Sequence, residues 1–307
     1  EKSAAQILRR ESREGFPVVF LAFPVKSVPS MGYVVGCINH GRDKKQAKEA
    51  AIPPCALSNE FFEIAIDPVS GDISRIYDKQ AHREVLAAAG GGNQIQILED
   101  FGDSEGFLKD KNGAVEHNTW DGSLSKTDEH PRMDWVEKGP LRKTIEIRRV
   151  FGLARFIQRI SLTAGSPVID FSLDIDWEGQ DKMVKTAFPL GIAAPSATYE
   201  IPYGNITRPS RGEEENAQNW VDLSDGGYGV ALINDSRYGY DVTKNTIRLS
   251  LLRSPSAPVA AKDDGGRTQG VGVRFPADDK TRLLREHPHP GCRSEEHTSE
   301  LQSHLNL

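Results

Sequence analysis

A strict alternation of apolar and polar residues between positions 169 and 177 constrains the fold of this chain more than any other feature. The apolar positions are Ile169, Phe171, Leu173, Ile175 and Trp177, and Asp170, Ser172, Asp174 and Asp176 lie between them. A period of two is typical of a β-strand with one face in a core and the other in water. After a turn at residues 178–181, the run 182–192 predicts a partner strand that ends at Pro189. We therefore expect a central hairpin within a larger β-structure.

Strand-like segments separated by turn residues recur along most of the chain. The clearest are residues 59–66, 72–78, 93–98, 141–150, 156–162, 220–224, 228–234 and 245–253. The 28 Gly and 18 Pro are spread between such segments, as short strands and tight turns require. Since all-β domains often exceed about 200 residues, the 307-residue chain predicts an all-β fold built on one large sandwich.

Four other segments carry local predictions. The charged residues 1–15 predict a short helix, and residues 16–35 predict two strands broken by Pro24 and Pro29, a partial upstream β segment. Residues 99–135 are polar and rich in Gly, Asp and Asn, which predicts a long irregular excursion. The acidic stretch 212–216 is interpreted as a solvated loop.

Composition excludes several classes of partner and site. A formal net charge of -6, with both signs interspersed, argues against nucleic acid and anionic membranes as partners. No run of 18 apolar residues occurs, so we expect no membrane span. The three cysteines, Cys37, Cys55 and Cys292, form neither a disulfide framework nor a zinc motif. The chain lacks an initiator Met and a visible signal segment, so we expect it to begin inside a longer or processed protein, with a cytoplasmic location favoured.

A set of short motifs occurs in a distinctive order over residues 57–255. The motifs include Asn59-Glu60-Phe61, Tyr77-Asp78-Lys79, Glu84-Val85-Leu86, Ile175-Asp176-Trp177, Lys185-Thr186-Ala187-Phe188-Pro189, Tyr199-Glu200-Ile201-Pro202-Tyr203-Gly204, Arg208-Pro209, Trp220-Val221-Asp222-Leu223-Ser224 and Arg248-Leu249-Ser250-Leu251-Leu252-Arg253-Ser254-Pro255. Each motif is short, but the ordered set resembles the C-terminal region of glycoside hydrolase family 38 α-mannosidases.

The resemblance implies a galactose-mutarotase-like β-sandwich, or supersandwich, from an enzyme that hydrolyses terminal α-mannosides with retention. Such an enzyme uses a zinc ion, an Asp nucleophile and a second carboxylate as acid and base. In the family these groups belong to an N-terminal domain marked by a His-x-Asp motif, which this sequence does not contain. We therefore expect no catalytic residue, no metal ligand and no cofactor in this chain. Its expected partners are a mannose-containing glycan and the separate catalytic domain.

Two residues are candidates for substrate contact. The resemblance places Arg208 in the segment that brings an arginine towards the active site, and a guanidinium can hold sugar hydroxyls in fixed geometry. The alternative is an ion pair with Glu200 or with the acids at 213–215. Tyr203 could stack or hydrogen-bond at a sugar site, and its alternative is a packing role. For Trp177, Trp220 and Tyr228 we expect core packing.

The ends of the chain depart from the family pattern. Residues 1–54 are interpreted as the end of a preceding linker or small β region, and residues 55–255 as the family 38 C-terminal sandwich. Residues 256–292 lack alternation, as a frameshift would cause, and residues 293–307 match the translation of a sequencing-library adapter. We expect both of these segments to be disordered or unpaired.

Two other functions compete with the mannosidase interpretation. A non-catalytic carbohydrate-binding sandwich is compatible with the same fold, since fold alone does not fix function. A polysaccharide lyase or sugar epimerase would need an acid and a base converging in a concave face, but His40, His82, His117 and His130 lie in connecting segments. The sequons at Asn205 and Asn234 are interpreted as chance matches.

Overall fold

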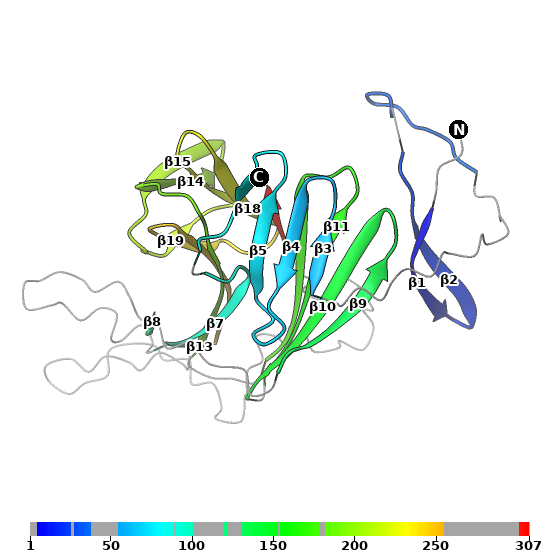
Figure 1. Cartoon of the computed structure of the whole chain (residues 1–307), viewed down its shortest axis with the longest axis horizontal. Coiled ribbons are helices and arrows are strands. Elements are labelled where there is room, and N and C mark those ends of the chain that lie inside the picture. The colour runs from blue at the N-terminus through cyan, green and yellow to red at the C-terminus, as the bar shows by residue number, and fades with distance from the viewer. Residues whose placement is uncertain are drawn as a thin grey trace, which may run out of the picture.

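The computed structural model describes residues 5–25, 28–37, 55–88, 90–100, 120–121, 130–152, 154–177, 182–254 and 301–306. Every regular element within these ranges is a β-strand, which confirms the predicted all-β class. The strands form four antiparallel sheets of nine, six, four and two strands (Figure 1). Within the same ranges, no helix is long and apolar enough to cross a membrane.

The largest sheet has nine strands. In spatial order they are β15 (Gly204–Pro209), β14 (Ser196–Ile201), β17 (Trp220–Ser224), β18 (Gly229–Asn234), β21 (Leu301–Asn306), β12 (Val168–Asp176), β11 (Ala154–Thr163), β10 (Arg142–Phe151) and β9 (Arg132–Lys138). The predicted alternation holds in β12, where Ile169, Phe171 and Leu173 are buried and Asp176 is exposed. Trp177, directly after β12, belongs to the core as expected.

The second sheet has six strands and includes β13, the strand that follows β12 in the sequence. Its strands are β16 (Glu215–Asn216), β19 (Gly239–Thr243), β20 (Thr246–Ser254), β13 (Lys182–Pro189), β7 (Gln94–Asp100) and β8 (Trp120–Asp121). The predicted hairpin between β12 and β13 is therefore wrong, because β13 pairs with β20 and β7 instead. In β13 the six residues from Met183 to Phe188 are all buried, which is typical of a central strand covered on both faces.

One hydrophobic core joins the two large sheets. The rings of Phe171 in β12 and Phe188 in β13 meet edge to face, with their centroids 5.4 Å apart. The ring of Phe156 in β11 makes similar contacts with Phe151 and Trp177, at 5.2 and 6.3 Å. Tyr228 packs against this core and is partly buried, as expected, whereas Trp220 is half-buried in β17.

A four-stranded sheet covers part of the nine-stranded one. It contains β3 (Ala56–Ser58), β4 (Phe62–Ile66), β5 (Ile73–Asp78) and β6 (Arg83–Glu84), and the predicted hairpin of residues 59–66 with 72–78 is confirmed. Asn59 joins the two sheets through its side-chain amide. Its Oδ1 accepts hydrogen bonds from the amides of Phe61 and Phe62, at 2.9 and 2.7 Å. Its Nδ2 donates to the carbonyls of Thr163 and Ser166, at 3.1 and 3.2 Å, in the β11–β12 turn.

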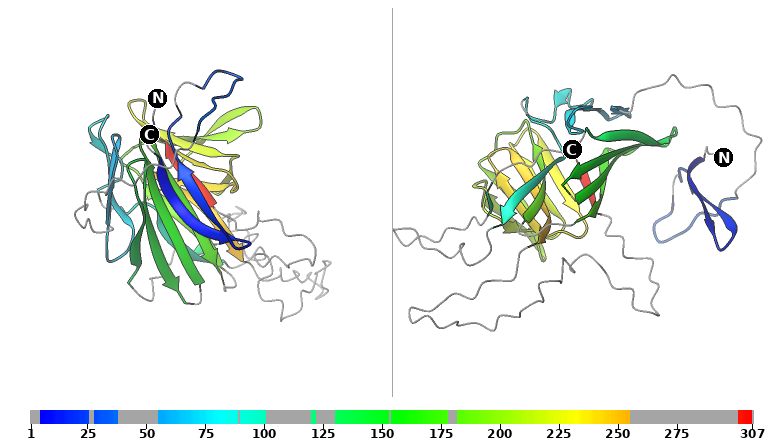
Figure 2. Two further views of the ribbon diagram at one scale, coloured as in Figure 1. Left: turned by 90° about the vertical axis from the view of Figure 1, so that its right-hand side faces the viewer. Right: turned by 90° about the horizontal axis from the view of Figure 1, so that it is seen from below.

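The upstream β segment is a hairpin of β1 (Gln6–Arg13) and β2 (Phe16–Ala22), set apart from the large sheets (Figure 2). The helix predicted for residues 1–15 is therefore wrong over β1. Glu14 and Gly15 have φ of 52° and 84°, the left-handed pair that a tight two-residue hairpin turn requires. The charged residues of β1 thus lie in a strand that is largely exposed on both faces.

The hairpin is attached to the β9–β10 turn through the buried side chain of Gln6. Its Oε1 accepts hydrogen bonds from the amides of Leu141 and Arg142, at 2.9 and 2.8 Å, and its Nε2 donates to the Arg142 carbonyl at 2.8 Å. Gly139 makes room for it, because a Cβ there would lie 1.9 Å from Gln6 Cδ.

The C-terminal segment contributes a strand, contrary to expectation. β21 lies between β12 and β18 and pairs antiparallel with both, so the prediction that the tail is unpaired is wrong for residues 301–306. Without a strand there, both neighbours would present open edges, and the backbone of any extended segment can satisfy those edges whatever its side chains. The predictions for residues 255–300 lie outside the described residues.

The irregular excursion expected over residues 99–135 is shorter than predicted. β7 extends to Asp100, β8 contains Trp120 and Asp121, and β9 begins at Arg132. Trp135 therefore lies in a strand. Residues 101–119 and 122–129 lie outside the described residues.

Candidate functional site

Both residues predicted to contact substrate lie on one hairpin at the edge of the nine-stranded sheet. β14 and β15 pair from Ser196↔Pro209 to Ile201↔Gly204, and Pro202 and Tyr203 form the turn between them. β15 has no neighbour on its outer side among the described strands. The hairpin therefore presents its tip and one edge to any partner.

Tyr203 occupies the tip in an unusual conformation. Its φ is 66°, in the left-handed region where Gly or Asn is the ordinary choice after a proline in a turn. Its side chain is fully exposed, so the alternative prediction of a packing role is wrong. A strained, exposed aromatic residue is compatible with a contact surface.

Arg208 is held on β15 by three neighbours. Its guanidinium carbon lies 5.1 Å from the ring centroid of Tyr199, a buried residue of β14. Its Nη1 donates to the Asn216 carbonyl at 3.0 Å, and its Nε lies 3.3 Å from Glu215 Oε2. Among the described residues, Nη2 has no hydrogen-bond partner, and 24% of the side chain is exposed. The ion pair with the 213–215 acids thus exists, and it leaves one donor group available.

The two residues are separated within the hairpin. Arg208 follows Tyr203 by five positions along an extended strand, which corresponds to roughly 15 Å. At that backbone separation, the two side chains are suited to different parts of a longer glycan or to different partners.

Behind Arg208 lies a network of buried charges that the sequence did not reveal. Lys185 of β13 has only 3% of its side chain exposed, and its Nζ lies 2.6 Å from Asp241 Oδ2 of β19. Lys185 also contacts Glu214, and Arg248 of β20 lies 2.6 Å from Asp241 Oδ1. Two cations and two carboxylates therefore neutralise one another inside the fold.

This network corrects the interpretation of the acidic stretch 212–216 as a solvated loop. Glu214 contacts Lys185 and Ser250, while Glu215 and Asn216 form β16 and pair with β19. Glu215 in turn pairs with Arg208. The stretch thus links the predicted site residue to the buried network.

Burial and nearby carboxylates keep Tyr199 protonated beneath Arg208. Desolvation raises the pKa of its phenol, and the charges of Glu215 and Asp241 raise it further. Desolvation also raises the pKa of Tyr228, whose hydroxyl donates to Asp78 at 3.1 Å, and of Tyr240.

These three phenols predict a loss of stability at alkaline pH. Because their pKa values are raised on folding, their stabilising effect is complete below the unfolded value of about 10 and declines as pH rises through the folded values. We expect the urea midpoint to fall steadily above about pH 10, and to fall less steeply in Tyr240→Phe. The tyrosinate absorbance, measured in parallel, should rise as the protein unfolds. Ionisation of all tyrosines while the protein stays folded would contradict the prediction.

The described histidines and acids do not form a metal site. Within the described ranges, no three His, Cys, Asp or Glu side chains converge closely enough to hold an ion. His82 and His130 are exposed in loops, and His40 and His117 lie outside the described residues.

Residues 57–261 match the C-terminal domain of the glycosyl hydrolases of family 38. Because this match spans more than half of the chain, the chain belongs to glycosyl hydrolase family 38. Similar curated proteins are alpha-mannosidase 2C1 of Mus musculus, 38% identical over 226 residues, and alpha-mannosidase G of Dictyostelium discoideum, 30% identical over 229 residues. Each comparison covers 68% of this chain and 20% of the relative. The matched part of the chain thus spans about a fifth of these relatives' length.

Solved structures show the same fold at low sequence identity. An alpha-mannosidase from Enterococcus faecalis V583 gives a TM-score of 0.58 at 15% identity, covering 83% of this chain and 33% of its own. A family 38 protein from Enterococcus faecalis gives 0.64 at 14% identity, covering 99% of this chain and 37% of its own.

Proposed function

We propose that this chain is the accessory β-domain of an α-mannosidase and that it contributes substrate contacts without being catalytic itself. The observation that carries the proposal is the family 38 match over residues 57–261. The zinc ion, the nucleophile and the acid/base carboxylate of a retaining mechanism would then belong to a separate domain. The natural substrate would be a terminal α-mannoside of a glycan or oligosaccharide.

We infer also that the nine- and six-stranded sheets form a sandwich of the galactose-mutarotase type. The edge-to-face contact of Phe171 with Phe188 supports this, because each sheet supplies one of the two rings. In such a sandwich the β14–β15 hairpin lies at a sheet edge, where it can reach a neighbouring domain.

Arg208 is the substrate-contacting residue that we propose. Glu215, Asn216 and Tyr199 fix its guanidinium, so that its Nη2 can donate to a sugar hydroxyl with little loss of side-chain entropy. Tyr203 at the hairpin tip is proposed as a contact to a more distant sugar of the same glycan or to the catalytic domain.

Hydrolysis of a chromogenic α-mannoside tests the accessory role. The 307-residue chain should be inactive with or without added zinc or cobalt, and fusion to a family 38 catalytic domain should give activity. Activity of the chain alone would contradict the proposal. Binding of mannosides by the chain alone, with no gain on fusion, would favour a carbohydrate-binding module.

In the fused protein, Arg208→Ala is expected to raise KM roughly tenfold or more, because a hydrogen bond to a charged donor contributes about 1.5–3 kcal/mol. Arg211→Ala, which removes an exposed arginine of the following loop, is the matched control and should leave KM unchanged. Equal KM values for the two variants would show that Arg208 has only a structural role.

A further inference from the structure

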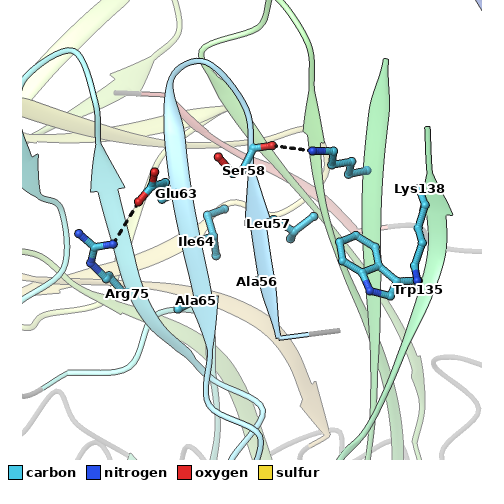
Figure 3. Close-up of a pocket in the computed structure, with 10 residues that line it drawn as sticks. Ala56, Leu57, Ser58, Glu63, Ile64, Ala65, Arg75, Trp135 and Lys138 are labelled. Carbon is cyan, nitrogen blue, oxygen red and sulfur yellow. Dashed lines mark hydrogen bonds and ion pairs between the residues drawn. The ribbon is translucent and has the colours of Figure 1, made fainter. Parts of the chain in front are cut away.

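A half-open groove separates the four-stranded sheet from the β9–β10 hairpin (Figure 3). Its volume is about 310 Å³, at the small end of the range for ligand pockets. One wall consists of residues 56–58 and 63–65 of β3 and β4 with Arg75 of β5. The other consists of Trp135 and Lys138 of β9 and Lys143 of β10.

The groove has an apolar floor and an aromatic wall. Leu57 and Ile64 are buried core residues whose side chains reach the groove, and Trp135 packs partly against the same core. An apolar surface with a few polar groups at its rim is the usual composition of a site for a small organic ligand. A rigid aromatic ring suits the flat face of a sugar or another ring.

The rim of the groove carries an unbalanced positive charge. Lys138 and Lys143 are direct partners across the β9–β10 ladder. The Lys143 Nζ donates to the Ser58 carbonyl at 3.2 Å, and the Lys138 Nζ lies 5.2 Å from the Trp135 ring centroid. The two ammonium groups therefore lie at different ends of the rim, one beside Ser58 and the other beside Trp135 (Figure 3).

The one carboxylate that lines the groove does not neutralise these lysines. Glu63 Oε2 lies 3.4 Å from Arg75 Nη1, and Glu63 Oε1 lies 3.4 Å from the Nζ of Lys79. The groove is therefore cationic on a chain whose formal net charge is -6. The local charge of the groove is thus opposite in sign to the net charge of the chain, as expected for a specific site for an anion.

We propose that this groove binds a monosaccharide that carries an anionic group, such as a uronic acid. The anionic group lies beside Lys138 at the cationic rim, and the ring covers Trp135 and the apolar floor. The site is independent of Arg208 and of the proposed mannoside contact, since it is built from different strands.

Titration of the ¹⁵N-labelled chain with glucuronic acid tests the site, with glucose as the matched neutral sugar and sodium sulfate as the matched anion. Trp135→Phe identifies the indole Nε1–H signal of Trp135. We expect a saturable shift of that signal with glucuronic acid. Glucose and sulfate should each bind at least about tenfold more weakly than glucuronic acid. The affinity for glucuronic acid should fall as salt rises, because the contact is electrostatic.

The double variant Lys138→Gln/Lys143→Gln should lose at least tenfold in affinity for glucuronic acid, while Lys244→Gln, an exposed turn lysine, should not. A thermal unfolding curve shows that each variant remains folded. Equal affinity of the unaltered chain for glucose or for sulfate would overturn the proposal. If glucuronic acid causes no saturable shift in the unaltered chain, that result alone would also overturn the proposal.

Discussion

Replacing Lys185 by Met is expected to lower the free energy of unfolding by about 3–5 kcal/mol. The substitution keeps the volume and the apolar stem but removes the ammonium group that lies between Asp241 and Glu214. Asp241 is 1% exposed, so its carboxylate would keep only Arg248 as a cationic partner inside the fold. Removing one member of a buried ion pair is costly because the other charge is left without full compensation.

Urea unfolding followed by tryptophan fluorescence measures this loss. Lys244→Met is the matched control, since Lys244 is exposed in the β19–β20 turn, and it should change stability by less than about 0.5 kcal/mol. A loss below about 1 kcal/mol for Lys185→Met would mean that the network relaxes or admits water. That result would also weaken the link between the network and the orientation of Arg208 through Glu215.

Asn59→Ala is expected to cost about 2–4 kcal/mol, because it removes four hydrogen bonds of about 1 kcal/mol each and leaves part-buried backbone groups unpaired. The four-stranded sheet would lose its attachment to the β11–β12 turn. The Gly165 amide in that turn also donates to the Glu60 carboxylate, so we expect the contact between the four-stranded sheet and the turn to weaken without being lost.

Two further substitutions make this prediction specific. Asn59→Asp keeps the acceptor for Phe61 and Phe62 but sets a carboxylate oxygen against the carbonyl oxygens of Thr163 and Ser166, so it should cost at least as much as Asn59→Ala. Asn205→Ala, at an exposed position of β15, should have little effect. Urea midpoints of the three variants, measured together, provide the comparison, and an Asp variant clearly more stable than the Ala variant at position 59 would contradict the assigned geometry.

The positions of most strands could be predicted from the sequence, but their pairing could not. Alternation located β12, and turn residues located the β4–β5 hairpin, because both are local properties of the chain. The partners of β12 and β13 depend on which sheet each apolar face covers, which only the assembled core decides. β21 was not predicted, because its place depends on two open edges supplied by β12 and β18.

The candidate site was predictable only as far as its exposed residues. Arg208 and Tyr203 stood out through the resemblance and their hairpin context. The buried partners of Arg208 come from β13, β19, β20 and the segment before β16, which no sequence spacing connects. One signal was available: Lys185 interrupts a run of residues that is otherwise suited to a strand covered on both faces, and such a lysine requires a buried carboxylate.

The attachment of the β1–β2 hairpin through Gln6 has a consequence for motion. An isolated two-stranded hairpin is only marginally stable, so the order of this one depends on how long the Gln6 amide stays bound to Leu141 and Arg142. The hairpin should therefore open as a cooperative unit of its own, with amide hydrogens that exchange far faster than those of β10 and β11 in the central sheet. A partner that binds the hairpin would slow that exchange and so could set how rigidly this part of the chain is held.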